Sequence, residues 1–145
     1  MHMVPFKSRF LSRFRADQSG AVAVEFVLIA PILLTLVFGI VTVGYFMGVS
    51  HSVSQLASGA ARSSVSGLDE AERRAIARSY LNEAGARYPL LVQDAVTSTI
   101  AFDTAEVDGI TVSVVYDVDG SLLDIANGFL KLGITTINGS AYVAY

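Results

Sequence analysis

A long run of hydrophobic positions dominates the first third of the chain. From Phe26 to Val49 there are 24 consecutive residues without a charged side chain. A helix rises 1.5 Å per residue, so this run reaches about 36 Å, more than the roughly 30 Å hydrocarbon core of a bilayer. We therefore predict a transmembrane helix over residues 21–49, loosened at Pro31, whose ring removes one helical hydrogen bond.

Helical periodicity continues beyond the apolar run. Hydrophobic residues recur on one helical face at Val49, Val53, Leu56 and Ala60. This spacing predicts that the same helix extends to about residues 62–65.

A second helix is predicted to begin after Asp69. An aspartate at the N-cap, with Glu72 three residues later, is typical of a capping box. The helix is expected to end near Gly85, because glycine is common after the last helical turn, and Pro89 cannot continue it.

The periodicity becomes twofold from Val96 onward. Hydrophobic and polar residues alternate over residues 96–102 and 110–118, and each alternation predicts a strand with one buried face. Residues 120–131 are expected to form a loop or a short helix. Beyond them, Asn138-Gly139 favours a tight hairpin turn between residues 134–137 and 140–145, because both central residues of such a turn need positive φ. The sequence thus predicts an α+β fold, in which the long N-terminal helix extends into a small domain with a second helix and a three- or four-stranded antiparallel sheet.

Charge is distributed unevenly about the apolar run. Residues 1–20 hold four basic residues and one acidic residue, whereas residues 21–145 hold 6 basic and 12 acidic residues. Basic residues beside a transmembrane helix favour the cytoplasmic side, so the C-terminal domain is expected outside the cytoplasm. Three segments follow: a basic leader peptide at 1–20, the transmembrane helix at 21–49 and an extracytoplasmic domain at 50–145. The acidic balance of that domain argues against nucleic acid as a partner.

A secretory signal peptide is the first alternative for the apolar run. Ala57, Gly59 and Ala61 are small residues of the kind that a signal peptidase accepts. The apolar core of a signal peptide is about 7–15 residues long, much shorter than this run. Length therefore favours a retained helix.

The chain lacks the residues that common enzymes need. Its two histidines, His2 and His51, lie in the leader and just beyond the apolar run, it has no cysteine, and no nucleophile motif or phosphate-binding loop is present. We expect no enzymatic activity, no cofactor and no metal site. Two acidic clusters could hold calcium, but the second lacks the bidentate glutamate of a calcium loop, and turn formation explains the Asp and Gly residues there equally well. These clusters are Asp103, Glu106 and Asp108, and Asp117, Asp119 and Gly120.

Glu25 is a carboxylate at the edge of the apolar run, where a charge is costly. It could simply mark the membrane boundary. If the chain were cut after Gly20, however, Ala21 would acquire an amino group four residues from Glu25, on the same helix face. The carboxylate would then have a cation to pair with, in its own chain or in a neighbouring one.

Glycines along the run offer small surfaces for a neighbouring helix. Gly44 and Gly48 form a GxxxG match, whereas Gly39 and Gly44 are five residues apart. Small residues are common in membrane helices, so this spacing indicates close packing only weakly.

The N-terminal third resembles a known family. Residues 13–15 carry two arginines, residues 20–26 read GAVAVEF, and the apolar helix then contains Pro31 and the sequence Phe-Gly-Ile at 38–40. This order closely resembles the TadE-like proteins, which are pseudopilins, or minor pilins, of the tight adherence (Tad, or Flp) pilus system. The close resemblance covers about residues 13–44. Family members often have an acidic residue and an aromatic residue where Thr42 and Val43 stand here.

The resemblance implies a function. A prepilin peptidase would cleave after Gly20, leaving Ala21 as the new N-terminus, and would need Glu25. The product would be a non-enzymatic minor component of pilus assembly, with a pilin-like domain at 50–145. It would be anchored in the inner membrane as a single-pass protein with a periplasmic or extracellular C-terminal domain. Its partners would be the other Tad pilins and pseudopilins and the pilus assembly platform.

An uncleaved, membrane-anchored extracytoplasmic protein is the competing interpretation. Such a protein would use the C-terminal domain for binding or sensing unrelated to pili. In the sequence alone, only Gly20 and Glu25 separate the two functions.

Overall fold

The computed structural model describes residues 18–104 and 107–145 of the 145-residue chain. Most of the expected leader peptide, residues 1–17, and Glu106 of the first acidic cluster therefore lie outside the described residues. The chain divides into two units, residues 1–41 and 42–145. Each unit is described by itself.

The described part of the first unit is the N-terminal stretch of helix α2 (Gln18–Ser64). The helix includes Pro31 without a break, and the Thr35 hydroxyl donates a hydrogen bond to the Pro31 carbonyl at 2.8 Å. Its end at Ser64 confirms the predicted boundary near residues 62–65.

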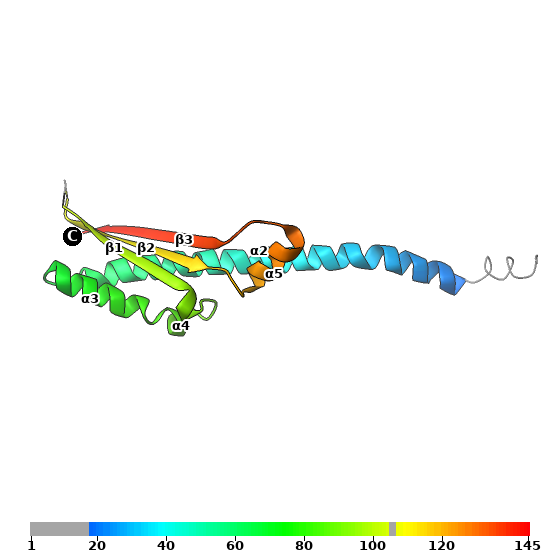
Figure 1. Ribbon diagram of the computed structural model, residues 1–145, viewed down its shortest axis with the longest axis horizontal. Helices are drawn as coiled ribbons and strands as arrows, with labels where there is room; N and C mark the ends of the chain where they lie inside the picture. The colour runs from blue at the N-terminus through cyan, green and yellow to red at the C-terminus, as the bar shows by residue number, and fades with distance from the viewer. Residues whose placement is uncertain (1–17, 105–106) are drawn as a thin grey trace, which may run out of the picture. The chain divides into compact units, whose positions relative to one another are not determined.

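The second unit packs a three-stranded antiparallel sheet on the C-terminal part of α2 (Figure 1). The strands are β1 (Val96–Asp103), β2 (Gly109–Asp117) and β3 (Thr136–Ala144), in the order β1-β2-β3. In the central strand the predicted alternation is confirmed, because one face is buried while Val115 and Asp117 on the other face are exposed. The buried side chains of this strand are Ile110, Val112, Val114 and Tyr116.

The core of the second unit lies between α2 and this sheet. The helix face predicted from its spacing is fully buried, and alanines on the same helix let the sheet approach closely because their side chains are short. The buried residues of α2 in this core are Val49, Val53, Leu56, Ala57, Ala60 and Ala61.

Helix α3 (Glu70–Leu81) begins where the sequence predicted it. The Asp69 carboxylate accepts a hydrogen bond from the Glu72 amide at 2.8 Å, as expected for the N-cap. The Glu72 carboxylate reaches one residue further back than in a standard capping box and accepts from the Leu68 amide at 2.8 Å.

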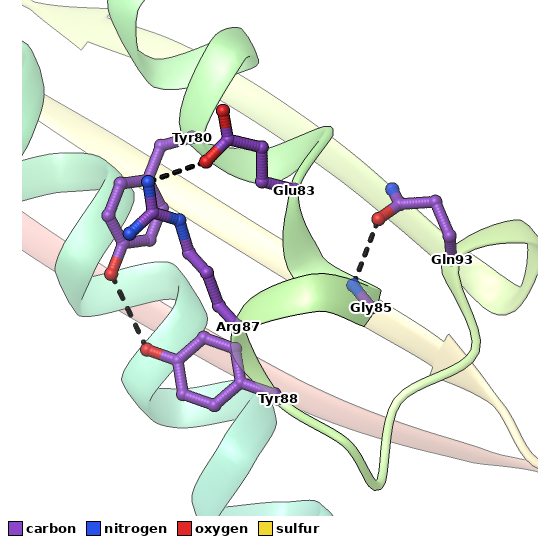
Figure 2. Close-up of polar contacts among 6 residues, drawn as sticks. All are labelled: Tyr80, Glu83, Gly85, Arg87, Tyr88 and Gln93. Carbon is purple, nitrogen blue, oxygen red and sulfur yellow. Dashed lines mark hydrogen bonds and ion pairs between the residues drawn. The ribbon is translucent and has the colours of Figure 1, made fainter.

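The predicted end of this helix near Gly85 was wrong. Helix α3 ends at Leu81, and Gly85 lies inside a separate short helix, α4 (Ala84–Arg87). The Gln93 side chain explains this arrangement, since it donates to the Leu81 carbonyl at 3.2 Å. The same side chain accepts from the Gly85 amide at 3.1 Å, as Figure 2 shows. It thereby satisfies backbone groups at the end of one helix and the start of the next. Gln93 itself opens the 3-10 helix η1 (Gln93–Ala95).

The predicted hairpin turn at Asn138-Gly139 was also wrong. Both residues lie within β3, where they pair with Val115 and Val114 of β2. Neither has positive φ, and a β-carbon on Gly139 would come within 3.0 Å of the Ser54 amide nitrogen and of a Val53 methyl group on α2. This glycine serves close contact between the strand and the helix, which outweighs its preference for turns.

Residues 120–131 contain a helix, α5 (Leu122–Leu130), between β2 and β3. The Ser121 hydroxyl caps it by accepting from the Leu123 amide, and Lys131 ends it in the left-handed conformation at φ 52°. The Asn127 side chain then bonds to both backbone groups of Ile134. These bonds hold the loop after α5 against the helix.

Candidate functional site

The expected cleavage site lies in the described part of α2. Gly20 and Ala21 are both helical, two and three residues after the first described residue, Gln18. Both are exposed, so the bond between them lies on the surface of the helix.

After this bond, α2 presents hydrophobic side chains in almost every direction. Most of the large hydrophobic residues from Val22 to Val41 are more than half exposed, with values of 69% at both Phe26 and Leu34. Within the described residues, α2 is the one helix that is long and apolar enough to cross a membrane. Such a surface needs an apolar environment, and a single N-terminal helix of this kind indicates a single-pass membrane anchor.

Glu25 is the acidic side chain of this exposed stretch. It is exposed on α2, one turn beyond Ala21. Residues four apart on a helix place their β-carbons about 5–6 Å from one another, close enough for an ion pair. The geometry therefore permits a contact between Glu25 and an amino group on Ala21, or on a neighbouring chain.

The three glycines of the expected packing surface have different surroundings. A β-carbon on Gly39 or Gly44 would meet nothing within 4 Å, so the chain leaves space beside both. A β-carbon on Gly48 would lie 2.8 Å from a Leu90 methyl group. Gly48 thus already accommodates a side chain of its own domain.

Comparison with protein families gives a match over this same helix. Residues 20–62 match the family model described as TadE-like protein. The chain carries a TadE-like segment. No curated protein and no solved structure matches the chain.

The TadE-like segment starts at Gly20 and ends two residues before α2 does. It therefore includes both the exposed apolar stretch and the alanine-rich part that packs on the sheet. The match confirms the resemblance seen in the sequence. The TadE-like family implies a minor component associated with the Tad pilus. Proteins of this family are structural components of the pilus and are not known as enzymes.

The sequence did not anticipate how the domain encloses part of the TadE-like segment. Thr42 and Val49 are buried, and Tyr45 packs against the core in contact with Tyr116 of β2. Residues 42–49 were assigned to the transmembrane helix by hydrophobicity alone. The available signal was the appearance of Thr42 and Tyr45, polar-tipped residues suited to a boundary.

The acidic turn residues and His51 have local roles. Asp117 accepts from the Asp119 amide at 3.0 Å and Asp124 from the Gly120 amide at 3.3 Å, as expected for turn residues. His51 shares a hydrogen bond with Gln55 on α2. Across residues 18–104 and 107–145, no three His, Cys, Asp or Glu side chains gather where they could hold a metal ion.

Proposed function

We propose that this protein is a pseudopilin-like minor component of Tad pilus assembly that a prepilin peptidase cleaves after Gly20. The observation that carries the proposal is the coincidence of three features around Gly20. The TadE-like match begins at Gly20, both residues of the Gly20–Ala21 bond are exposed, and an exposed apolar stretch of α2 follows. The helix would anchor the protein in the inner membrane, with the C-terminal domain on the periplasmic or extracellular side.

Glu25 has a specific role in this proposal. Cleavage would place a new ammonium group at the N-terminus of α2, where the helix dipole disfavours positive charge. A carboxylate one turn away, or on an adjacent subunit, offsets that cost because the pair lies beside an apolar environment of low dielectric. We infer that Glu25 neutralises the Ala21 amine of an adjacent subunit and sets the register between helices.

Helix packing is the third part of the proposal. The open space beside Gly39 and Gly44 allows another apolar helix to approach α2 closely. This second helix would belong to another Tad pilin or pseudopilin, or to the assembly platform.

An uncleaved membrane-anchored protein is the competing function, and cleavage by signal peptidase is a third possibility. Ala57 and Ala61 are fully buried in the middle of the core face of α2. A cut there would require the domain to unfold, which disfavours that route.

The N-terminus of the membrane-extracted protein tests the proposal. N-terminal sequencing and intact mass of the natural protein, of Gly20→Leu and of the control Gly39→Ala are expected to show a start at Ala21 in all but Gly20→Leu. A natural protein that starts at Met1 supports the uncleaved anchor instead, and a start between residues 57 and 62 supports signal peptidase. Glu25→Ala should then be assayed for cleavage and for incorporation into pili. Normal cleavage together with normal pili that contain the variant would contradict the role assigned to Glu25.

A further inference from the structure

The direction of β3 along α2 identifies one end of the second unit. Near its beginning, Gly139 lies against Ser54 of α2. At its other end, the Arg73 guanidinium stacks 3.5 Å above the ring of Tyr145, and the Arg73 Nε donates to the Gly67 carbonyl, three residues beyond the end of α2. The strand therefore runs in the same direction as the helix, and its first residue, Thr136, lies toward α2 residues 42–49.

Two other segments lie at this same end. Tyr116, next to the last residue of β2, contacts Tyr45, so the α5 segment between β2 and β3 starts and finishes here. On α2, Gly48 faces Leu90 in the turn between α4 and η1. Figure 1 shows α5 and the turn after α4 at the end of the sheet where β3 begins.

These segments expose an unusual number of large hydrophobic side chains. Phe129 is 78% exposed and Ile125, four residues earlier on the same face of α5, is 54% exposed, while Leu123 and Ala126 on the opposite side are buried in the domain. The bonds between Asn127 and Ile134 hold the following loop, and so Leu132, beside the helix. We call the exposed set the apolar rim, and its members are Leu90, Val92, Ile125, Phe129, Leu130 and Leu132.

Residues of α2 at this end of the second unit are also apolar and exposed. Val43 is 57% exposed and Met47 65%, and both belong to the uncharged run that has the length of a membrane span. The apolar rim therefore lies at the end of the domain that packs on the last residues of this run, through Tyr45 and Gly48. The charged residues of the two rim segments, 88–95 and 118–135, do not favour an anionic partner, because Asp94, Asp119 and Asp124 outnumber Lys131.

We propose that the apolar rim inserts into the lipid interface where α2 leaves the membrane, so that α5 lies in the headgroup region and the domain rests on the bilayer. An interfacial helix buries its apolar face about 5–10 Å into the boundary between headgroups and acyl chains. The expected lipids are zwitterionic, since apolar contact and not charge would hold the rim. This inference rests on the membrane anchor of the proposed function.

The absence of natural cysteines allows a direct test by single-site labelling. Phe129→Cys and Leu132→Cys report on the rim, Leu34→Cys reports on the apolar stretch of α2, and Leu68→Cys, at 91% exposure on the loop after α2, is the matched control away from the rim. Each full-length variant is labelled with an environment-sensitive fluorophore and reconstituted into phosphatidylcholine vesicles, with and without nitroxide-bearing phosphatidylcholine. For a label at 129 or 132, the emission maximum is expected to shift to shorter wavelength, and the nitroxide should quench most of the emission. A label at 68 should show neither change.

The outcomes separate the anchor from the rim. Quenching at 34, 129 and 132 supports the proposal. Quenching at 34 with none at 129 and 132 overturns the proposed insertion of the rim and leaves the membrane anchor supported. No quenching at 34 overturns the membrane anchor, and with it the insertion of the rim. If the emission of a label at 129 shifts without being quenched by the nitroxide, and the shift disappears when the protein is diluted in lipid, a second copy of the chain covers the rim. That outcome also overturns the proposed insertion of the rim into lipid.

Discussion

Gly139 of β3 lies so close to Ser54 of α2 that a β-carbon on the glycine would be 3.0 Å from the serine amide nitrogen. Two of the three nearest atoms belong to the Ser54 backbone, so they cannot turn away as a flexible side chain would, and the third is a Val53 methyl group. This contact brings the sheet close to the TadE-like helix, and it favours a glycine in mid-strand.

Replacing Gly139 with alanine is therefore expected to destabilise the domain. Overpacking typically costs about 1–3 kcal/mol, and each kcal/mol lowers the melting temperature of a domain of this size by about 4–8 °C. Thermal unfolding of the purified protein in detergent measures the change. The control is Gly128→Ala on α5, where a β-carbon meets nothing within 4 Å and φ is not positive, so alanine should stabilise by about 0.5–1 kcal/mol. Equal melting temperatures for the two variants would contradict the proposed contact.

Gln93→Met should weaken the connection between α3 and α4. The variant keeps the length of the side chain but loses its bonds to the Leu81 carbonyl and the Gly85 amide. A hydrogen bond contributes about 0.5–1.5 kcal/mol, and leaving a partly buried backbone group unpaired costs about 1–3 kcal/mol. Chemical denaturation is expected to show a loss in this range, with Asp94→Asn, an exposed neighbour, unchanged. Faster hydrogen exchange at the Gly85 amide would locate the effect, and unaltered exchange there would argue against it.

Gly44 and Gly48 are expected to respond differently to a large side chain. Gly48→Leu must displace the Leu90 side chain, which should reduce the free energy of unfolding of the isolated protein by about 1–3 kcal/mol. Its melting temperature should fall accordingly. Gly44→Leu enters open space and should leave that temperature unchanged while reducing association with partner helices, measured by co-purification of pilus components after crosslinking. If Gly44→Leu assembles normally, close helix packing at this position is not needed.

The ionisation of Tyr88 should make the stability of the domain depend on pH in the alkaline range. Burial, helped by the 3.5 Å hydrogen bond with the Tyr80 hydroxyl shown in Figure 2, raises the pKa of Tyr88 to about 12. The nearby charges of Arg87 and Arg62 lower this pKa but do not outweigh burial. An unfolded tyrosine has a pKa of about 10. Because the folded pKa is the higher one, the stabilisation is complete below pH 10 and is lost as the pH rises from 10 through 12.

Tyr88→Phe tests this expectation. The variant should lose less stability than the natural protein between pH 10 and 12, as measured by denaturation at a series of pH values. Tyr142→Phe, which removes the hydroxyl of an exposed side chain on β3, is the control for the loss of a tyrosine hydroxyl. A Tyr88→Phe slope equal to that of the natural protein would show that Tyr88 is not the group responsible.

Much of the fold was accessible from the sequence because its signals are local. The helix over the apolar run, the N-cap at Asp69 and the alternation over residues 110–118 each depend on neighbours only a few residues away, and all three predictions are confirmed. The TadE-like segment was equally accessible, since the resemblance rests on residues 20–26 and the apolar run directly after them.

The tertiary structure decided the points where a residue's partner is distant in the chain. Asn138-Gly139 has the local chemistry of a turn, but α2 pressing against the sheet requires a residue without a side chain in mid-strand. Gly85 has the chemistry of a helix end, but the side chain of Gln93 places that end four residues earlier. In the same way, hydrophobicity could not separate residues 42–49, which the domain partly encloses, from residues 21–41, whose apolar side chains remain exposed. The sequence by itself determined that a single apolar helix leads into a small α+β domain, because periodicity and length are properties of the chain alone. Only the packing of helix and sheet decided where the domain begins to cover that helix, because burial depends on which distant side chains meet.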